Sequence, residues 1–140
     1  SALLAEHFGR EDGDAPQGDL AAEAAHGAFI RTQHKAIRAC TDLADGGLAL
    51  AAFEMADAAQ TGLGIDVTGT AQLFGEDQAR YLIAASSENA ALLETAAQAA
   101  GIPLARIGTF GGTTLRLGTS ESKLADLQSL YRSAFAAAVN

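Results

Sequence analysis

CTDLADGGLALAAFEMA, residues 40–56, joins an alternating segment to a helical one through a turn with two aspartates and two glycines. Every second residue from Ile37 to Leu43 lies on one side of the chain and is apolar or threonine, which predicts a strand over residues 36–43. Beyond the turn, apolar residues recur at three- and four-residue steps, which predicts a helix from Gly46 to about Ala59. The face that we expect this helix to bury consists of Leu48, Ala51, Ala52, Met55 and Ala59.

The turn has two interpretations. In the first, Asp45 caps the helix, and Gly46 and Gly47 let the strand bend sharply into it. In the second, the glycines leave backbone N–H groups uncovered at the helix start, where the helix dipole favours an anion such as phosphate. Asp42 and Asp45 disfavour an anion unless a metal ion bridges them to it. The spacing alone leaves both interpretations open.

LFGEDQARYL, residues 73–82, is the second candidate for a site. We expect a strand from Gln72 to Ser86 with a polar start. On such a strand Glu76, Gln78 and Arg80 share one face, while Asp77 lies on the other. An acid, an amide and an arginine in a row suit a polar ligand or a metal, and they equally suit an exposed face with self-paired charges.

The remaining elements complete a mixed sheet covered by helices, of the α/β (α+β) class, in one domain over residues 1–140. Residues 1–18 are expected to form an irregular lead, since 10–18 are rich in turn residues. We expect helices from Asp19 to about Lys35 and over 86–101, a strand over 62–67, and a hairpin over 106–117 around two glycines. A last helix is expected from about Glu121. Its expected buried stripe is Leu124, Leu127, Tyr131, Ala134, Phe135 and Ala138.

Composition excludes several classes of protein. The net charge is −8 and no basic stripe is present, so we expect no nucleic-acid partner and no anionic membrane surface. No apolar run reaches the roughly 18 residues of a membrane span and no signal peptide is visible, so the cytoplasm is the expected location. Cys40 is the only cysteine and is expected to be a small buried residue. The three histidines lack metal-ligand spacing, and no metal site is expected.

Four segments together resemble one family. Residues 40–56 resemble its motif H-D-x-S-D-G-G-L…A-E-M-A, and residues 73–82 resemble F-G/S-E-x-Q-x-R-Y. FGREDGDAPQGDLAAE resembles the loop that leads into its first helix, and IGTFGGTTLRL resembles its closing hairpin. The family is that of the phosphoribosylformylglycinamidine synthases (formylglycinamide ribonucleotide amidotransferases), synthetase subunit II. The resemblance covers residues 7–118 and is to the last domain, of the aminoimidazole ribonucleotide synthetase C-terminal-domain type.

The resemblance implies an ATP-dependent ligase of de novo purine synthesis. That enzyme converts formylglycinamide ribonucleotide, ammonia from glutamine and ATP to formylglycinamidine ribonucleotide. It further implies that this chain is a fragment of a larger synthetase, whose N-type domains bring ATP, Mg²⁺ and the catalytic histidine. A glutaminase subunit and a small accessory subunit are the other implied partners. No catalytic residue, bound nucleotide or metal is assigned to this domain, which we expect to be inactive alone.

The resemblance also implies a pseudo-symmetric binding site for substrate or nucleotide in this domain. Its residues are Asp42, Asp45, Gly46, Gly47, Leu48, Glu76, Asp77, Gln78 and Arg80. Two departures weaken ligand binding here, because the motif's histidine is Thr41 and its serine is Ala44. The alternatives are another member with the same fold (aminoimidazole ribonucleotide synthetase, selenophosphate synthetase, thiamine-monophosphate kinase) and a stand-alone binding or scaffold domain.

Overall fold

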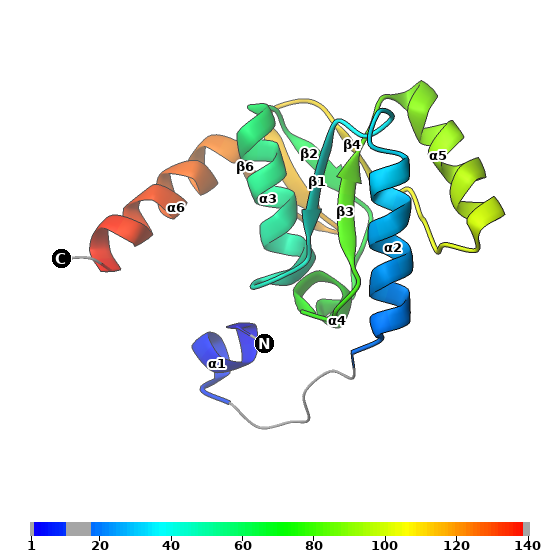
Figure 1. Ribbon diagram of the computed structural model, residues 1–140. Helices are drawn as coiled ribbons and strands as arrows, with labels where there is room; N and C mark the ends of the chain where they lie inside the picture. Colours follow the sequence, from blue (N-terminus) through cyan, green and yellow to red (C-terminus); the bar gives the residue numbers. More distant parts are fainter. Residues whose placement is uncertain (1, 11–17, 139–140) are drawn as a thin grey trace.

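The computed structural model describes residues 2–10 and 18–138 (Figure 1). Its helices are α1 (Ala2–Phe8), α2 (Leu20–Thr32), α3 (Gly47–Ala59), α4 (Thr70–Phe74), α5 (Ser87–Ala100) and α6 (Leu124–Ala138). Its strands are β1 (Ala39–Asp42), β2 (Leu63–Ile65), β3 (Tyr81–Ala84), β4 (Gly108–Phe110), β5 (Thr114–Leu117) and β6 (Ser120–Lys123). Helices and strands alternate from α2 to β4, and β5, β6 and α6 follow, which confirms the expected α/β (α+β) class.

The strands form two sheets. β1 and β3 pair antiparallel, and the second sheet has the order β4-β2-β5-β6. Within it β2 is parallel to β5 and antiparallel to β4, so the sheet is mixed, as expected. β3 lies between two apolar clusters: Leu82 packs in the larger one with α3, and Ile83 packs in a smaller one with α2 and α5. Since successive side chains of a strand point to opposite faces, helices cover both faces of β3.

Local capping signals place two of the helices, α2 and α5, where the sequence predicts them. The Asp19 carboxylate accepts a hydrogen bond from the N–H of Ala22 at the start of α2, at 2.9 Å. The Ser86 hydroxyl accepts one from the N–H of Asn89 at the start of α5, at 3.2 Å. α5 ends at Gly101, whose φ of 67° is left-handed, as is usual after a helix. The helix over 47–59 is confirmed, although Ala59 is exposed rather than buried.

The expected hairpin over 106–117 is wrong. β4 and β5 are strands, but they do not pair with each other, because β2 lies between them. The turn that should close the hairpin instead hydrogen-bonds the start of β2: the N–H of Gly111 donates to the carbonyl of Gly62, and the N–H of Gly62 donates to the carbonyl of Gly112. Alternation of side chains predicts strands but does not identify their partners.

The expected strand from Gln72 to Ser86 is also wrong over its first half. Residues 70–74 form α4, residues 75–80 form a loop, and only Tyr81–Ala84 is a strand. Glu76, Gln78 and Arg80 therefore do not share a strand face. The cause is local, since Arg80 donates hydrogen bonds to carbonyls at the end of α4 and so folds the loop back on that helix.

Two further expectations fail at the ends of the chain. Residues 2–8 of the expected irregular lead form α1, in keeping with their good helix formers alanine and leucine; residues 11–17 lie outside the described part. The last helix begins at Leu124 rather than Glu121, because 120–123 pair with β5 as β6. Of its expected buried stripe only Leu124 is buried and Leu127 half-buried. The exposed members are Tyr131, Ala134 and Ala138, and the side chain of Phe135 is outside the described part.

Two neighbouring leucines of α5 test the assignment of the smaller cluster. Leu93 is 2% exposed and Leu92 is 61% exposed. We expect Leu93→Ala to lower the free energy of unfolding by about 2–5 kcal/mol, because it leaves a cavity, and Leu92→Ala to change it by less than about 0.5 kcal/mol. Urea denaturation followed by circular dichroism measures both. Equal midpoints for the two variants would contradict the packing described here.

Candidate functional site

The turn between β1 and α3 owes its shape to two glycines. Gly46 and Gly47 have φ angles of 77° and 61°, in the left-handed region that glycine adopts without strain. Gly46 is the N-cap of α3 and offers no side chain. The interpretation of Asp45 as the cap is therefore wrong: it lies one residue too early, and its side chain is exposed. Asp42 is exposed as well, whereas Gly47 and Leu48 are buried.

The loop 75–80 meets this turn. The half-buried carboxylate of Glu76 accepts a hydrogen bond from the N–H of Gly46, Oε1 to N at 3.2 Å. At the far end of the loop, the N–H of Leu43 donates to the carbonyl of Arg80 at 3.0 Å. The two segments that the sequence singled out therefore lie side by side. A carboxylate from the chain itself already occupies the N-terminal end of α3, where the second interpretation placed an external anion.

The Arg80 guanidinium is engaged with the loop. It donates to the carbonyls of Gly75 and Gln72, at 3.3 and 3.1 Å, and lies 3.9 Å from the exposed carboxylate of Asp77. These carbonyls belong to the end of the short helix α4, whose unpaired acceptors a cation stabilises. Arg80 thus holds the loop 75–80 in place.

α2 completes the surroundings of this loop. The ring Nδ1–H of His26 donates to the carbonyl of Ala79 at 2.7 Å, and the amide of the exposed Gln78 lies against Gly18 just before α2. His26 is thereby part of the contact between α2 and the loop. Among the described residues no group of three His, Cys, Asp or Glu side chains could hold a metal ion. Binding of substrate or nucleotide by the predicted residues stays a prediction.

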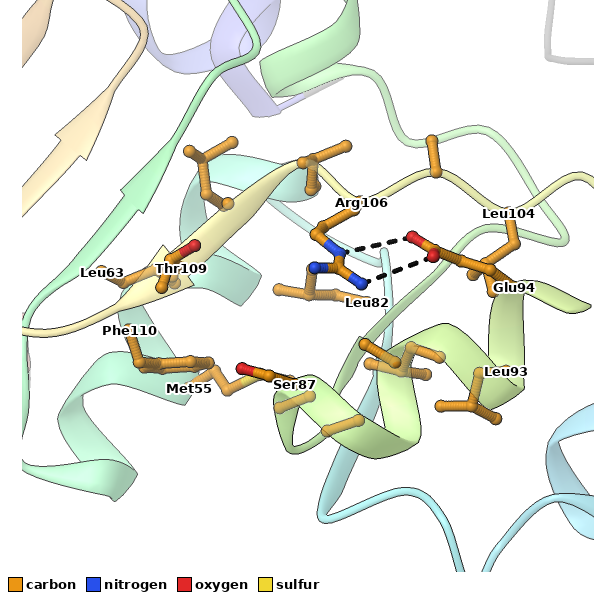
Figure 2. A pocket seen from close by; sticks show the side chains of 18 of the residues that line it. Met55, Leu63, Leu82, Ser87, Leu93, Glu94, Leu104, Arg106, Thr109 and Phe110 are labelled. Atoms are coloured by element: carbon orange, nitrogen blue, oxygen red, sulfur yellow. Dashed lines mark hydrogen bonds and ion pairs between the residues drawn. The ribbon is translucent and has the colours of Figure 1, made fainter.

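Two cavities lie beside β3, and sequence reasoning missed both, because their walls come from segments far apart in the chain. One, of about 400 Å³, is lined by His26 of α2, Leu48 of α3 and Arg80, so it adjoins the candidate site. The other, of about 340 Å³, lies between β3, β4 and α5 (Figure 2). Its wall is mostly apolar, with an ion pair at one side: Nε of Arg106 lies 3.3 Å from Oε1 of Glu94.

Comparison with known proteins gives a consistent picture. Residues 1–117 match the family model described as AIR synthase related protein, C-terminal domain. The chain is 60% identical over 139 residues to phosphoribosylformylglycinamidine synthase subunit PurL of Cereibacter sphaeroides, and 62% identical over 135 residues to that of Jannaschia sp. (strain CCS1). These alignments cover 99% and 96% of this chain but 19% of either relative, so the chain spans about a fifth of their length.

A solved structure shares the fold. It is described as T. maritima PurL complexed with FGAR, and it matches with a TM-score of 0.73 at 16% identity. The match covers 90% of this chain and 25% of that one.

Gly47 and Gly101 both have left-handed φ angles, so substitutions at the two positions distinguish the cost of backbone strain from the cost of steric crowding. A Cβ at Gly47 would lie 2.7 Å from the carbonyl oxygen of Gly75 and 2.9 Å from that of Leu73, whereas one at Gly101 would meet nothing within 4 Å. We expect Gly101→Ala to cost about 1–2 kcal/mol of unfolding free energy from strain alone. Gly47→Ala should cost about 1–3 kcal/mol more from overpacking. Urea denaturation measures both, and equal losses would show that the α3 start is not crowded.

The expectation that Cys40 is a small buried residue is wrong, because its side chain is exposed on the edge strand β1. Partial burial and then the charge of Asp42 raise the pKa of the thiol above its ordinary value of 9.0. Because the thiolate is the nucleophile, we expect alkylation of Cys40 by iodoacetamide to reach half its maximal rate only above pH 9.0.

A pair of variants measures the contribution of the Asp42 carboxylate to the raised pKa of the Cys40 thiol. Asp42→Asn should move the alkylation midpoint toward lower pH, and Asp45→Asn, on the same turn, should leave it in place. Mass spectrometry of the Cys40 peptide gives the rates. A parent midpoint at or below pH 9.0 would contradict the environment described for this thiol.

Proposed function

The chain belongs to the family of AIR synthase related proteins, C-terminal domain, and from this membership we propose that it is the C-terminal domain of a PurL-type phosphoribosylformylglycinamidine synthase. The observation that carries the proposal is the 60% identity over 139 residues to PurL of Cereibacter sphaeroides. Segments in the order of the GREDG loop, the aspartate–glycine turn and LFGEDQARYL support it over the other synthetases and kinases that share the domain type.

In this proposal the whole polypeptide is an ATP-dependent ligase. It joins ammonia, released from glutamine by a glutaminase subunit, to formylglycinamide ribonucleotide and yields formylglycinamidine ribonucleotide in the cytoplasm. The N-type domains of the same polypeptide bind ATP and Mg²⁺, and a small accessory subunit completes the complex. No helix in the described part of the chain is long and apolar enough to cross a membrane.

The residues described here do not fit a nucleotide phosphate with its magnesium ion. The Glu76 carboxylate accepts from the N–H of Gly46 and would repel a phosphate at the start of α3. The exposed aspartates of the same turn add negative charge, and among the described residues no three His, Cys, Asp or Glu side chains are grouped to hold a metal ion that could bridge them to a phosphate. We therefore derive no chemical step through these residues. Their proposed role is structural. The Glu76 carboxylate takes the place of an external anion at the start of α3 and so stabilises the turn.

A chimera tests the proposed function. The matching 139 residues of Cereibacter sphaeroides PurL are replaced by this chain, and the chimera is expressed in a bacterium that lacks its own PurL. We expect growth without added purines, since a domain with 60% identity should preserve the contacts of the parent enzyme. The unaltered PurL is the positive control. A chimera that accumulates as folded protein at the parent's level, yet supports neither growth nor formylglycinamidine ribonucleotide formation, would overturn the proposal.

A further inference from the structure

Residues 44–47, between β1 and α3, form a β-turn of type II. The N–H of Gly47 donates to the carbonyl of Ala44 at 3.0 Å, which closes the turn. Gly46, at the third position, has a φ of 77° and a ψ of −2°, near the values of about 80° and 0° that define type II. Asp45 has a negative φ, which excludes type I′. It therefore occupies the second position, where ψ is near about +120°.

Asp45 and Gly46 form the dipeptide in which aspartate isomerises most readily, because no side chain on the glycine hinders attack by its nitrogen. That nitrogen forms a bond to Cγ of Asp45, and the carboxyl hydroxyl and the amide proton leave as water. The product is a five-membered succinimide. A second water opens the ring at either carbonyl, and opening at the main-chain carbonyl leaves isoaspartate, in which the main chain runs through Cγ.

The side chain of Asp45 is exposed, so solvent has access to both steps of this reaction. The type II turn nevertheless keeps the reacting atoms apart. In the succinimide ring, Cβ of Asp45 and the nitrogen of Gly46 are eclipsed about the Cα–C bond. For an L-residue this requires a ψ of about −120°, the value found in the mirror-image type II′ turn. At a ψ near about +120° the nitrogen eclipses Hα instead, and Cγ cannot reach it.

Contacts on the α3 side of the turn oppose the rotation that would bring the two atoms together. The N–H of Gly46 donates to Oε1 of Glu76 at 3.2 Å, so rotation of this peptide unit has to break that hydrogen bond. Gly47, which follows, is buried against the carbonyl of Gly75. The turn can therefore change its conformation only when the loop 75–80 moves away from it.

We propose that Asp45–Gly46 is a latent isomerisation site, which the type II turn and the hydrogen bond to Glu76 keep unreactive in the folded domain. Glu76 acts as an acceptor rather than as a base, since a carboxylate is too weak to remove an amide proton and its charge disfavours the amide anion that attacks Cγ. Displacement of the loop 75–80 exposes the site to reaction. This inference does not depend on the proposed function.

The modification would be damaging because of its position. Isoaspartate adds one carbon to the main chain immediately before the first turn of α3. A Cβ at Gly47 would already lie 2.7 Å from the carbonyl oxygen of Gly75, so the start of α3 has no room for a lengthened turn. A modified domain could not restore this packing when the loop 75–80 returns.

Isoaspartate formation in the full-length polypeptide tests the proposal. The polypeptide is kept at neutral pH, either folded or unfolded in urea. Isoaspartate at position 45 is measured by chromatography of the peptide that contains it and by methylation with an isoaspartyl methyltransferase. We expect formation in the folded polypeptide to be at least about tenfold slower than in urea, because reaction requires local opening. Equal rates in the two states would overturn the proposal.

Three variants test the part played by Glu76. Glu76→Ala removes the acceptor of the Gly46 N–H, and Glu76→Gln keeps an acceptor oxygen at the same place. Asp77→Ala is the matched control, since it removes an exposed carboxylate of the same loop that faces Arg80. In the folded polypeptide, Glu76→Ala should form isoaspartate at least about tenfold faster than the parent, and the other two should stay within about threefold of it.

Circular dichroism establishes that each variant is folded. A folded Glu76→Ala variant that reacts at the parent's rate overturns the proposal. So does an Asp77→Ala variant that reacts as fast as Glu76→Ala, because loss of charge and not of the hydrogen bond would then be the cause. If Glu76→Ala does not fold, the comparison of the folded parent with the parent in urea still decides whether the turn protects Asp45.

Discussion

The close contact between Gly47 and the backbone of residues 73–75 determines how the start of α3 packs against the end of α4 and the loop 75–80. With no side chain at position 47, the first turn of α3 can lie directly on the carbonyls of Leu73 and Gly75. That approach brings the N–H of Gly46 within reach of Glu76. It also sets the direction of α3, whose Leu48 and other buried residues pack on both sheets in the larger core cluster. The turn, the loop 75–80 and the packing of α3 in the core thus all require a residue without a Cβ at position 47.

Signals confined to a few neighbouring residues predicted the structure well. Asp19, Ser86 and Gly101 act at helix ends through their own side chain or backbone, so their effect can be recognised from sequence alone. The glycine pair before α3 marked a sharp turn for the same reason. The family resemblance also placed the aspartate–glycine turn and LFGEDQARYL in one site. The hydrogen bond from the N–H of Gly46 to Glu76 shows that the two segments are in contact.

Features that depend on distant partners could not be predicted in this way. β4 and β5 have a hairpin pattern, but β2, more than 40 residues earlier, displaces that pairing because it supplies buried Leu63 and Ile65 between them. Arg80 was expected in a strand, but it lies in a loop where its guanidinium bonds the carbonyls of Gln72 and Gly75 at the end of α4. Asp45 failed as a cap because left-handed glycines, rather than a side chain, begin α3. For β4 and β5 a tertiary contact decided the pairing, whereas the other two outcomes depend on neighbouring residues whose effect on the backbone the pattern does not show.

α6 carries large apolar side chains that the rest of the domain leaves exposed. α6 is attached to α3 as far as Arg132, since Oδ1 of Asp57 accepts from Gln128 at 2.6 Å and from Arg132 at 3.4 Å. Beyond this contact the helix projects from the body (Figure 1). Leu130 and Tyr131, between the two anchoring residues, are 65% and 49% exposed. Large apolar side chains exposed on a projecting helix are typical of a surface that packs against another body. The fold therefore behaves as one part of a larger packed unit, which agrees with the proposal that its chemistry is shared with other domains.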